Sequence, residues 1–257
     1  MKTLLSLFDE TGEASRPYWD AGWNVVQVDL KFGTDINDFC CEALMELLDG
    51  QTAEHVIMQP PCTDFTNSGA LWWDSKDADG RTEASAELVR QSMRTIEFLR
   101  PDVWWLENPV GRIERIVPCI GRRKAIIEPW HYAGYTDPTA EELARLLELR
   151  QLGEAGRFGE MTEADIDLTR RINAYTKKTA LWGMFTLPER REIQPVRVCK
   201  QGSWLMRLGG KSDRTKTLRS ATPAGFAMAM FLANQDTELD WEAIDEGEAE
   251  YPWDFEA

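Results

Sequence analysis

The sequence predicts an α/β fold in which a mostly parallel, twisted sheet carries helices on both faces. Short apolar runs alternate with segments of helical periodicity through the N-terminal part of the chain. Such alternation is typical of βαβ units, whose crossover helices cover a parallel sheet. The length of 257 residues suits one large domain, or one domain with a small appendage.

The predicted elements follow in order along the chain. The strands are expected at residues 3–8, 24–30, 54–58 and 102–106. The helices between them are expected at residues 13–22, 38–48 and 83–100, and the last must end before Pro101. Residues 59–82 are expected to form a polar loop that contains glycine.

The pattern weakens in the second half. A short strand is expected at 125–128, helices at 138–152 and 162–174, strands at 179–182 and 203–206, and a helix at 223–233. The two helices at 138–174 have the character of an insertion. We therefore expect a core at 1–135, a small helical insertion at 136–174, a basic part at 175–235 that completes the core, and an acidic tail at 236–257.

Charge is distributed unevenly. The chain has a net charge of -15, yet residues 177–219 hold eleven basic and three acidic side chains. That region is suited to contact phosphates, although a solvated charged face explains it as well. The tail holds ten acidic residues and no basic ones, and Trp241, Tyr251, Trp253 and Phe255 are its candidate anchors.

Several classes of protein are disfavoured by composition. Five cysteines without a CxxC pair, beside two histidines, argue against a zinc site and a disulfide framework. Reduced thiols fit a cytoplasmic location. The chain has no apolar run long enough for a membrane span, and its N-terminus is expected to be a first strand rather than a signal peptide.

Two reactive side chains follow two predicted strands. Cys62 stands after Pro60 and Pro61, whose fixed φ angles hold it rigidly in a polar loop. Glu107 ends a tryptophan-rich strand, so we expect its carboxyl to be partly desolvated, with a raised pKa. A thiol nucleophile and a carboxylic acid at one sheet edge suit covalent chemistry on a ring. A buried structural cysteine and a structural glutamate are the plain alternatives.

A turn with glycine follows the first predicted strand. Residues 7–15 pass from a strand through Gly12 to a helix start, which suits a nucleotide-type cofactor. Asp29, at the end of the second strand, is placed to hold ribose hydroxyls. Asp35 is placed to meet an adenine amine, or else it caps a helix.

These motifs together resemble those of DNA cytosine-5 methyltransferases, and most closely the small phage-type members. The resemblance rests on Phe8-x-x-x-Gly12, Asp29, Pro60-Pro61-Cys62-x-x-Phe65-Thr66 and Glu107-Asn108-Pro109-Val110. It is thinner at 175–183 and at 219–223. It implies a Rossmann-like class I S-adenosylmethionine-dependent methyltransferase fold with a reduced target-recognition region.

The resemblance also implies a mechanism. Cys62 would add to C6 of cytosine while Glu107 protonates N3, so that C5 accepts the methyl group of S-adenosylmethionine. Asn108 would orient the loop that bears Cys62, and Lys178 would stand in for a base-contacting arginine. The target base must leave the duplex, at a cost of roughly a few kcal/mol.

The implied ligands are S-adenosylmethionine and double-stranded DNA with a flipped cytosine, bound by a monomer in the cytoplasm of a bacterium or phage-infected host, without a metal. The residues expected to bind the cofactor are Phe8, Thr11, Gly12, Asp29, Leu30, Asp35, Ile36 and Pro60. Glu10 stands where the family has glycine, so it is expected to crowd or repel the methionine carboxylate.

Two alternatives remain open at this point. Only residues 185–219 are available for the usual recognition domain, and the chain is acidic. The same chemistry on a free pyrimidine nucleotide or on RNA would need less recognition surface. A degenerate methyltransferase fold that binds or mimics DNA is the non-enzymatic alternative.

Overall fold

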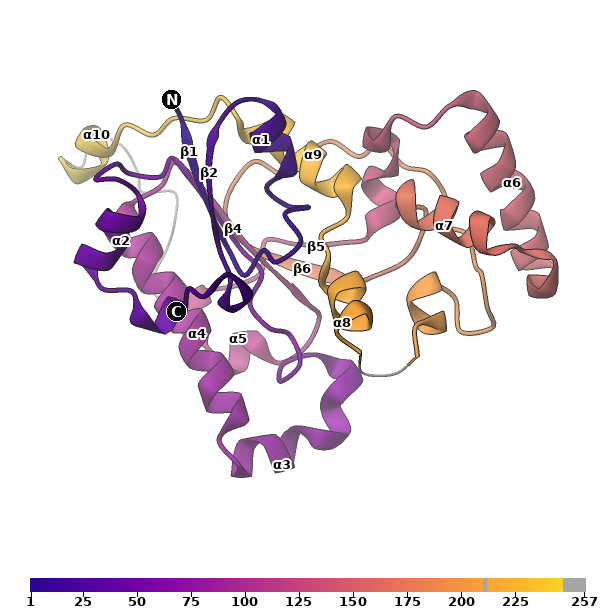
Figure 1. Ribbon diagram of the computed structural model, residues 1–257, viewed down its shortest axis with the longest axis horizontal. Coiled ribbons are helices and arrows are strands. Elements are labelled where there is room, and N and C mark those ends of the chain that lie inside the picture. The colour runs from indigo at the N-terminus through magenta and orange to yellow at the C-terminus, as the bar shows by residue number, and fades with distance from the viewer. Residues whose placement is uncertain (210–211, 247–257) are drawn as a thin grey trace. The chain divides into compact units, whose positions relative to one another are not determined.

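The computed structural model describes residues 1–209 and 212–246. The chain divides into two compact units, and Figure 1 shows the elements of both. Unit 1 comprises Met1–Ile126, Thr179–Thr186 and Asn234–Ala257, of which the structure describes residues up to 246. Unit 2 comprises Ile127–Lys178 and Leu187–Ala233. The helical segment at 136–174 therefore belongs to the same unit as most of the basic segment.

A six-stranded sheet has the order β2-β1-β3-β4-β6-β5. Its strands are β1 (Thr3–Leu7), β2 (Asn24–Val28), β3 (His55–Met58), β4 (Val103–Pro109), β5 (Ala125–Ile127) and β6 (Thr179–Met184). The pairs β1–β2, β1–β3 and β3–β4 are parallel, and β6 runs antiparallel to β4. The prediction of an α/β fold with a mostly parallel sheet is confirmed.

Helices connect the strands of unit 1. They are α1 (Arg16–Asp20), α2 (Cys41–Leu47), α3 (Trp73–Ala78), α4 (Arg81–Leu99), α5 (Ile113–Ile116) and α10 (Trp241–Asp245). Short 3-10 helices are η1 (Leu30–Phe32), η2 (Ile36–Asp38), η3 (Asn67–Trp72) and η4 (Pro118–Ile120). The helix α4 ends at Arg100, which has a left-handed φ of 49°, directly before Pro101. The predicted end of this helix is confirmed, because proline cannot continue it.

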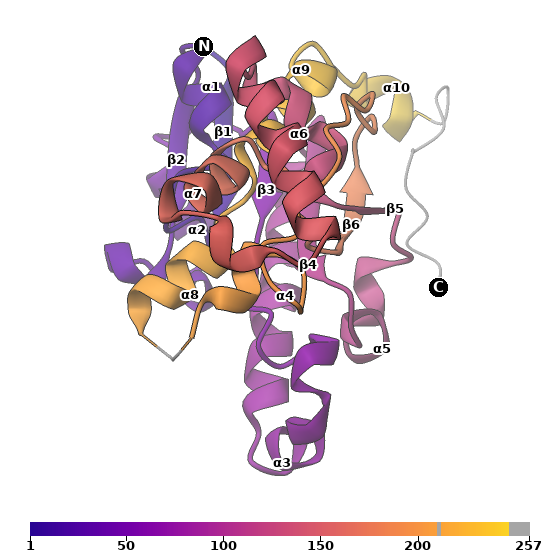
Figure 2. The same cartoon turned by 90° about the vertical axis from the view of Figure 1, so that its right-hand side faces the viewer.

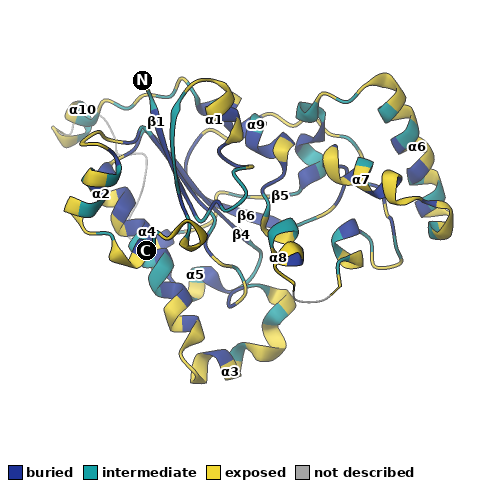
Figure 3. Cartoon of the chain, in the orientation of Figure 1, coloured by how far each residue is buried: buried dark blue, intermediate teal, exposed yellow. Residues whose placement is uncertain are grey.

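Different helices pack on the two faces of the sheet. Leu5, Val56 and Trp104 are in register on one face and belong to the main core of unit 1, together with apolar residues of α2 and α4. Figure 1 shows α2 and α4 along this side of the sheet. The opposite face receives Tyr18 of α1, whose hydroxyl lies 3.0 Å from Nδ1 of His55. Figure 3 shows most of the sheet in dark blue, as buried, whereas the edge strand β2 is largely intermediate.

Two predicted elements are wrong. Residues 59–82 are not a plain loop, since they include η3 and α3. A buried lysine, Lys76, anchors α3 through its ion pair with Asp64. The segment has no apolar periodicity from which this helix could be predicted. Residues 203–206 form no strand but the 3-10 helix η7 (Trp204–Arg207), because the Ser203 side chain accepts from the Leu205 N–H at 3.2 Å.

Unit 2 is built mainly from helices. They are η5 (Pro129–Thr136), α6 (Ala140–Glu154), η6 (Phe158–Glu160), α7 (Glu163–Arg171), η7, α8 (Asp213–Ser220) and α9 (Ala224–Asn234). Capping boxes start α6 at Thr139 and α7 at Thr162. Arg145 of α6 binds Asp165 of α7 through two hydrogen bonds of 2.8 and 2.9 Å, so the two predicted helices form a joined pair.

The first part of the acidic tail is anchored to unit 1. The Trp241 ring lies 4.5 Å from the Arg100 guanidinium, which also pairs with Asp245 at 2.6 Å. Lys2 pairs with Glu238 at 3.1 Å. These contacts hold residues 236–246, whereas the other candidate anchors, Tyr251, Trp253 and Phe255, lie outside the described residues.

Within residues 1–209 and 212–246, no helix is long and apolar enough to cross a membrane. The same residues contain no cluster of histidine, cysteine and acidic side chains suited to hold a metal ion. None of the five cysteines, all of which lie among the described residues, forms a disulfide bond.

We expect His55 to make stability depend on pH. Burial, and to a smaller extent the charge of Lys2, lowers the pKa of His55 to about 3 from an ordinary value of 6.5. Between these values the unfolded chain binds more protons, so stability falls as pH drops from 6.5 towards 3. The contribution is up to ~1.4 kcal/mol per pH unit.

Urea unfolding of wild type and His55→Gln at several pH values between 4 and 6.5 measures this effect. The variant should show the flatter dependence, because glutamine does not titrate. Parallel curves for the two proteins would contradict the assignment.

Candidate active site

Four residues form one row across the edge of the sheet, three of them directly after β1, β2 and β3 and the fourth within the last part of β4. Val28, Leu7, Met58 and Leu106 are register partners in β2, β1, β3 and β4. The next positions along these strands are Asp29, Phe8, Gln59 and Glu107. Neighbouring strands are about 4.8 Å apart. The loop with Gly12, the loop with Cys62 and the end of β4 therefore begin side by side.

The order of the strands makes this edge a topological switch point. From β1 the chain moves first to β2 on one side and then to β3 on the other. Open α/β sheets bind ligands in the crevice outside the carboxyl ends of two such strands. Here the loop after β1 contains Phe8–Ser15, and the loop after β3 contains Cys62.

Cys62 begins a tight turn. Its carbonyl oxygen accepts hydrogen bonds from the N–H groups of Phe65 at 3.1 Å and Thr66 at 3.0 Å. Pro60 is buried and Pro61 is exposed, while the cysteine itself is partly buried. The thiol is thus carried by a short, hydrogen-bonded turn rather than by a long irregular loop.

The end of β4 is linked directly to the loop of Cys62. Asn108 is 1% exposed, and its Nδ2 donates to the carbonyl oxygen of Pro60 at 3.0 Å. Its neighbour Glu107 is 6% exposed and remains within the β4–β6 pairing opposite Leu181. The amide therefore ties the thiol-bearing loop to the strand that carries the carboxyl group.

The segment after Glu107 approaches the Cys62 turn very closely at Gly111. A Cβ atom added to Gly111 would lie 1.9 Å from the carbonyl oxygen of Phe65, so only glycine fits. Gly111 and Thr66 form an isolated antiparallel bridge, and the Arg112 N–H donates to Phe65 O at 2.9 Å. The two segments are thereby joined along their backbones.

The Arg112 side chain extends this connection. It is 5% exposed, and its Nε donates to the carbonyl oxygen of Asp64 at 3.0 Å. Its two terminal nitrogens bind the carboxylate of Asp77 at 2.8 and 2.7 Å, and one of them also donates to Thr82 Oγ1 at 2.8 Å. The hydrogen bonds from Arg112, and then that from Thr82, lower the pKa of Asp77 to about 2.

A buried lysine braces the same turn from the other side. Lys76 is 6% exposed and pairs with Asp64 at 3.1 Å, while it also donates to the carbonyl oxygen of Thr63 at 2.5 Å. Asp64 Oδ2 accepts from Ser85 Oγ of α4 at 2.6 Å. Polar side chains on α3, α4 and the segment after β4 thus all converge on residues 63–65.

Beyond the turn, η3 and α3 project from the sheet (Figures 1 and 2). Leu71 is 89% exposed and Trp72 is 62% exposed. Trp73, by contrast, lies under the Arg112 guanidinium, at 4.7 Å from its ring centroid. The bracing therefore fixes one tryptophan and leaves its neighbour in solvent.

The loop after β1 is shaped by Asp9, which sequence reasoning missed. Asp9 is 1% exposed, and its Oδ2 accepts from Ser6 Oγ at 2.9 Å and from the Ser15 N–H at 3.2 Å. Its Oδ1 is buried, and none of residues 1–209 and 212–246 donates a hydrogen bond to it. Its carbonyl oxygen accepts from Gln27 Nε2 at 3.0 Å, so Asp9 holds the loop to both β1 and β2.

The remaining residues of this loop adopt unusual backbone angles. Phe8 has a φ of 62°, and its N–H donates to Val28 O at 2.7 Å. Gly12 has a φ of 68°, and a Cβ there would meet Gln27 Nε2 at 3.1 Å. Thr11 Oγ1 accepts from the Glu13 N–H at 3.3 Å. A strained, well-bonded turn of this kind is typical of functional loops.

The loop after β2 contains four of the expected cofactor residues. Asp29 and Asp35 each cap a 3-10 helix, with Oδ1 atoms that accept from the N–H groups of Lys31 and Asn37 at 2.9 Å. Ile36 is buried, whereas Leu30 is 71% exposed. Asp35 is therefore a cap in this structure, and its contact with adenine remains a prediction.

Glu10 forms an ion pair with Lys31, which joins the loop after β1 to the loop after β2. The expectation that Glu10 repels the methionine carboxylate took no account of this neighbouring cation. Lys178, the remaining expected site residue, belongs to unit 2 and is exposed there. Its predicted contact with the target base remains a prediction.

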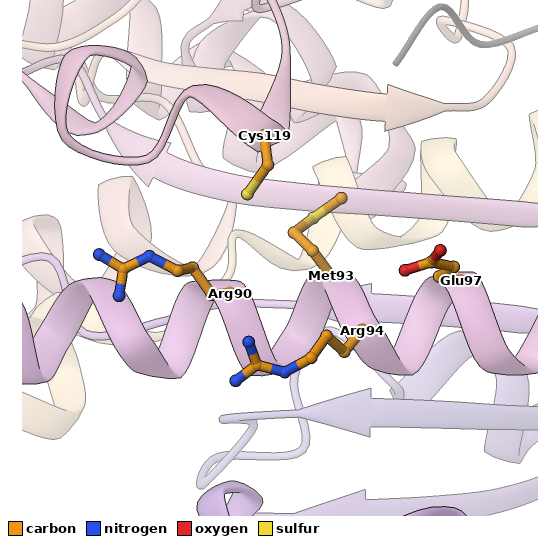
Figure 4. Close-up of a pocket in the computed structure, with 5 residues that line it drawn as sticks. All are labelled: Arg90, Met93, Arg94, Glu97 and Cys119. Carbon is orange, nitrogen blue, oxygen red and sulfur yellow. The ribbon is translucent and has the colours of Figure 1, made fainter. Parts of the chain in front are cut away.

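A separate hollow of about 510 Å³ lies between α4 and η4 (Figure 4). It is lined by Arg90, Met93, Arg94, Glu97 and Cys119. Glu87 binds both arginines, and burial raises the pKa of the Cys119 thiol, which favours the unreactive protonated form. This hollow contains none of the residues at the strand ends.

No model of a known protein family matches the chain, and no curated protein does. Among solved structures, the chain is similar to a putative DNA modification methyltransferase encoded within a prophage of E. coli, with 12% identity and a TM-score of 0.41. The similarity covers 83% of this chain and 56% of that one.

It is also similar to a methyltransferase of Entamoeba histolytica, with 12% identity, a TM-score of 0.37, and coverage of 84% of this chain and 62% of the other. The chain thus spans 56% and 62% of the length of these two proteins.

We expect Arg112 to determine the stability of the Cys62 turn. Arg112→Met keeps an unbranched apolar stem but removes every side-chain donor to Asp64, Asp77 and Thr82. Hydrogen bonds that involve charged groups contribute about 1.5–3 kcal/mol, so urea unfolding should show a loss of about 2 kcal/mol or more. Hydrogen exchange should also become faster in residues 62–82.

The exposed Arg122 offers a matched control, and Arg122→Met should change stability by no more than about 0.5 kcal/mol. Equal stabilities of the two variants would show that Arg112 does not brace the turn.

Proposed function

We propose that this chain is a DNA cytosine-5 methyltransferase that uses S-adenosylmethionine. The observation that carries the proposal is the joining of the Cys62 turn to the end of β4 by Asn108, Gly111 and Arg112. A nucleophile and an acid act on one small ring only if their two supports keep a constant spacing. These contacts supply such a spacing at a switch point between two parallel strands.

Cys62 serves as the nucleophile in this proposal. Its Sγ forms a bond to C6 of cytosine, and the electron pair of the C5–C6 double bond moves so that C5 becomes nucleophilic. C5 would then accept the methyl group of the cofactor. Loss of the C5 proton to a water molecule, followed by expulsion of the thiolate and return of the N3 proton to Glu107, would restore the aromatic ring. Partial burial at the head of a hydrogen-bonded turn suits a group that must approach one atom of a flipped base.

Glu107 serves as the acid. Protonation at N3 withdraws electrons from C6 and lets the thiol add, which is a task for a carboxyl group kept from water. Glu107 is 6% exposed at the end of a strand, directly before the Asn108 that holds the Cys62 loop. This burial supports the role of a proton donor over that of a solvated surface carboxylate.

The cofactor would be held by the loops after β1 and β2. S-adenosylmethionine supplies an electrophilic methyl group on a positively charged sulfur. The fit of this chain to such a ligand is supported by Asp9, whose buried Oδ1 receives no donor from the protein. An unsatisfied buried acceptor costs about 1–3 kcal/mol, so a cationic ligand that compensates it would be favoured.

The polynucleotide would be bound by basic and apolar surfaces. Lys178, Arg214 and Lys216 are exposed in unit 2, which suits contact with phosphates. In unit 1, the exposed Leu71 and Trp72 follow the Cys62 turn. Apolar and aromatic side chains of this kind insert between bases or stack on unpaired ones.

A duplex that contains 5-fluorocytosine tests the proposed chemistry. Fluorine replaces the C5 hydrogen that must be lost as a proton, and it cannot itself leave as a cation. The adduct with Cys62 should therefore persist after methyl transfer and appear as a shifted band on a denaturing gel. The substitution Cys62→Ser should abolish the band. The matched control Cys119→Ser should retain it, because Cys119 lies in the separate hollow. Absence of a trapped complex with wild type, although the cofactor binds, would end the catalytic proposal.

Transfer of a tritium-labelled methyl group to duplex DNA, single strands, RNA and dCMP in parallel identifies the substrate. We expect the label in duplex DNA, owing to the basic surface of unit 2. Label in dCMP alone would exclude DNA as the substrate while it leaves the roles of Cys62 and Glu107 intact.

A further inference from the structure

The loops that flank the proposed cofactor site carry a strong negative charge. Residues 8–15 and 29–36 contain five acidic side chains and one basic side chain, for a net charge of -4. The acidic residues are Asp9, Glu10, Glu13, Asp29 and Asp35, and the basic residue is Lys31. The two loops are in direct contact through the ion pair of Glu10 with Lys31 and the hydrogen bond from Phe8 N to Val28 O.

These charges differ in how far water and neighbours offset them. Glu10 is neutralised by Lys31, and Glu13 is exposed to solvent, which screens its charge. Asp29 and Asp35 are partly buried, and each already accepts a backbone N–H with one oxygen. Asp9 alone among the five is fully buried, at 1% exposure.

Asp9 is also the residue with an unsatisfied atom. Its Oδ2 accepts from Ser6 and Ser15, whereas Oδ1 has no hydrogen-bond donor within the described chain. Within the described residues, no lysine, arginine or histidine forms an ion pair with this carboxylate. A buried carboxylate is stabilised by donors from its own protein, from ordered water or from a ligand, and the described residues supply donors to Oδ2 alone.

We propose that Asp9 makes the cofactor site selective for cationic adenosyl ligands, so that it binds the sulfonium cofactor in preference to the neutral thioether left after methyl transfer. This inference rests on the proposed function, because it presumes an adenosyl ligand between these loops. Transfer of the methyl group removes one positive charge from the sulfur, while the charge of Asp9 is unchanged. The same carboxylate therefore attracts the donor and releases the product.

The test compares three ligands by isothermal titration calorimetry on the full chain. S-adenosylmethionine carries a sulfonium, sinefungin carries a protonated amine at the same position, and S-adenosylhomocysteine carries a neutral thioether. Wild type should bind both cations at least about tenfold more tightly than the thioether, which corresponds to about 1.4 kcal/mol. Equal or tighter binding of the thioether would overturn the proposal.

Two variants assign the preference to Asp9. In Asp9→Asn, an isosteric change whose carbonyl oxygen still accepts from Ser6 and Ser15, the preference should fall to about threefold or less. The matched control Glu13→Gln, which removes an exposed charge from the same loop, should keep the preference of wild type. A full preference in Asp9→Asn would overturn the assignment.

The variant Ser6→Ala should change the preference for cationic ligands in the opposite direction to Asp9→Asn. It removes one donor from the carboxylate, so the charge of Asp9 is less offset and the preference for cations should rise. If Asp9→Asn melts far below wild type, the binding data of Ser6→Ala are used in its place. A preference of Ser6→Ala for cationic ligands that is equal to or lower than that of wild type would overturn the proposal. Failure of all three ligands to bind wild type would instead refute the proposed function, whereas binding without preference refutes only the role of Asp9.

Discussion

The close approach of the Cys62 turn to the segment after Glu107 is the constraint on which the proposed site depends. At Gly111 the two backbones are so near that no side chain fits between them, and the Arg112 side chain then reaches across to Asp64 and Asp77. A thiol on a free loop would sample many positions relative to a carboxyl group on a strand. The joined backbones remove that freedom, and Lys76 removes more of it from the opposite side.

The loop after β1 is ordered by the side chain of Asp9. Nucleotide-binding turns commonly use several glycines so that backbone N–H groups approach the ligand. This chain has one glycine in the turn, Gly12, and relies on Asp9 to bind Ser6, Ser15 and Gln27. The result is a turn that is both ordered and negatively charged. Such a site is better matched to a cationic ligand than to a phosphate.

Much of the fold follows from local patterns. The parallel strands were predictable because buried strands read as continuous apolar runs, and α4 had to end before Pro101. The cap at Asp35 was one of two readings that its position allowed. The segment 59–82 was not predictable, because Lys76 is ordinarily a surface residue and its burial depends on Asp64, which lies twelve positions earlier in the chain. The helix η7 was missed because its start is set by a hydroxyl, Ser203, and not by apolar spacing.

By itself, the sequence determined the class of the fold and named the candidate reactive groups. Apolar runs and proline positions act locally, and Cys62 and Glu107 are recognised as candidates by residue type and by their place after apolar runs. Only the tertiary structure decided which groups support them. Arg112, Lys76 and Asp9 look like ordinary charged residues until burial removes water from around them. Their importance arises because a buried charge must find a partner, and that partner is chosen by the packing of distant segments and not by the neighbours in the chain.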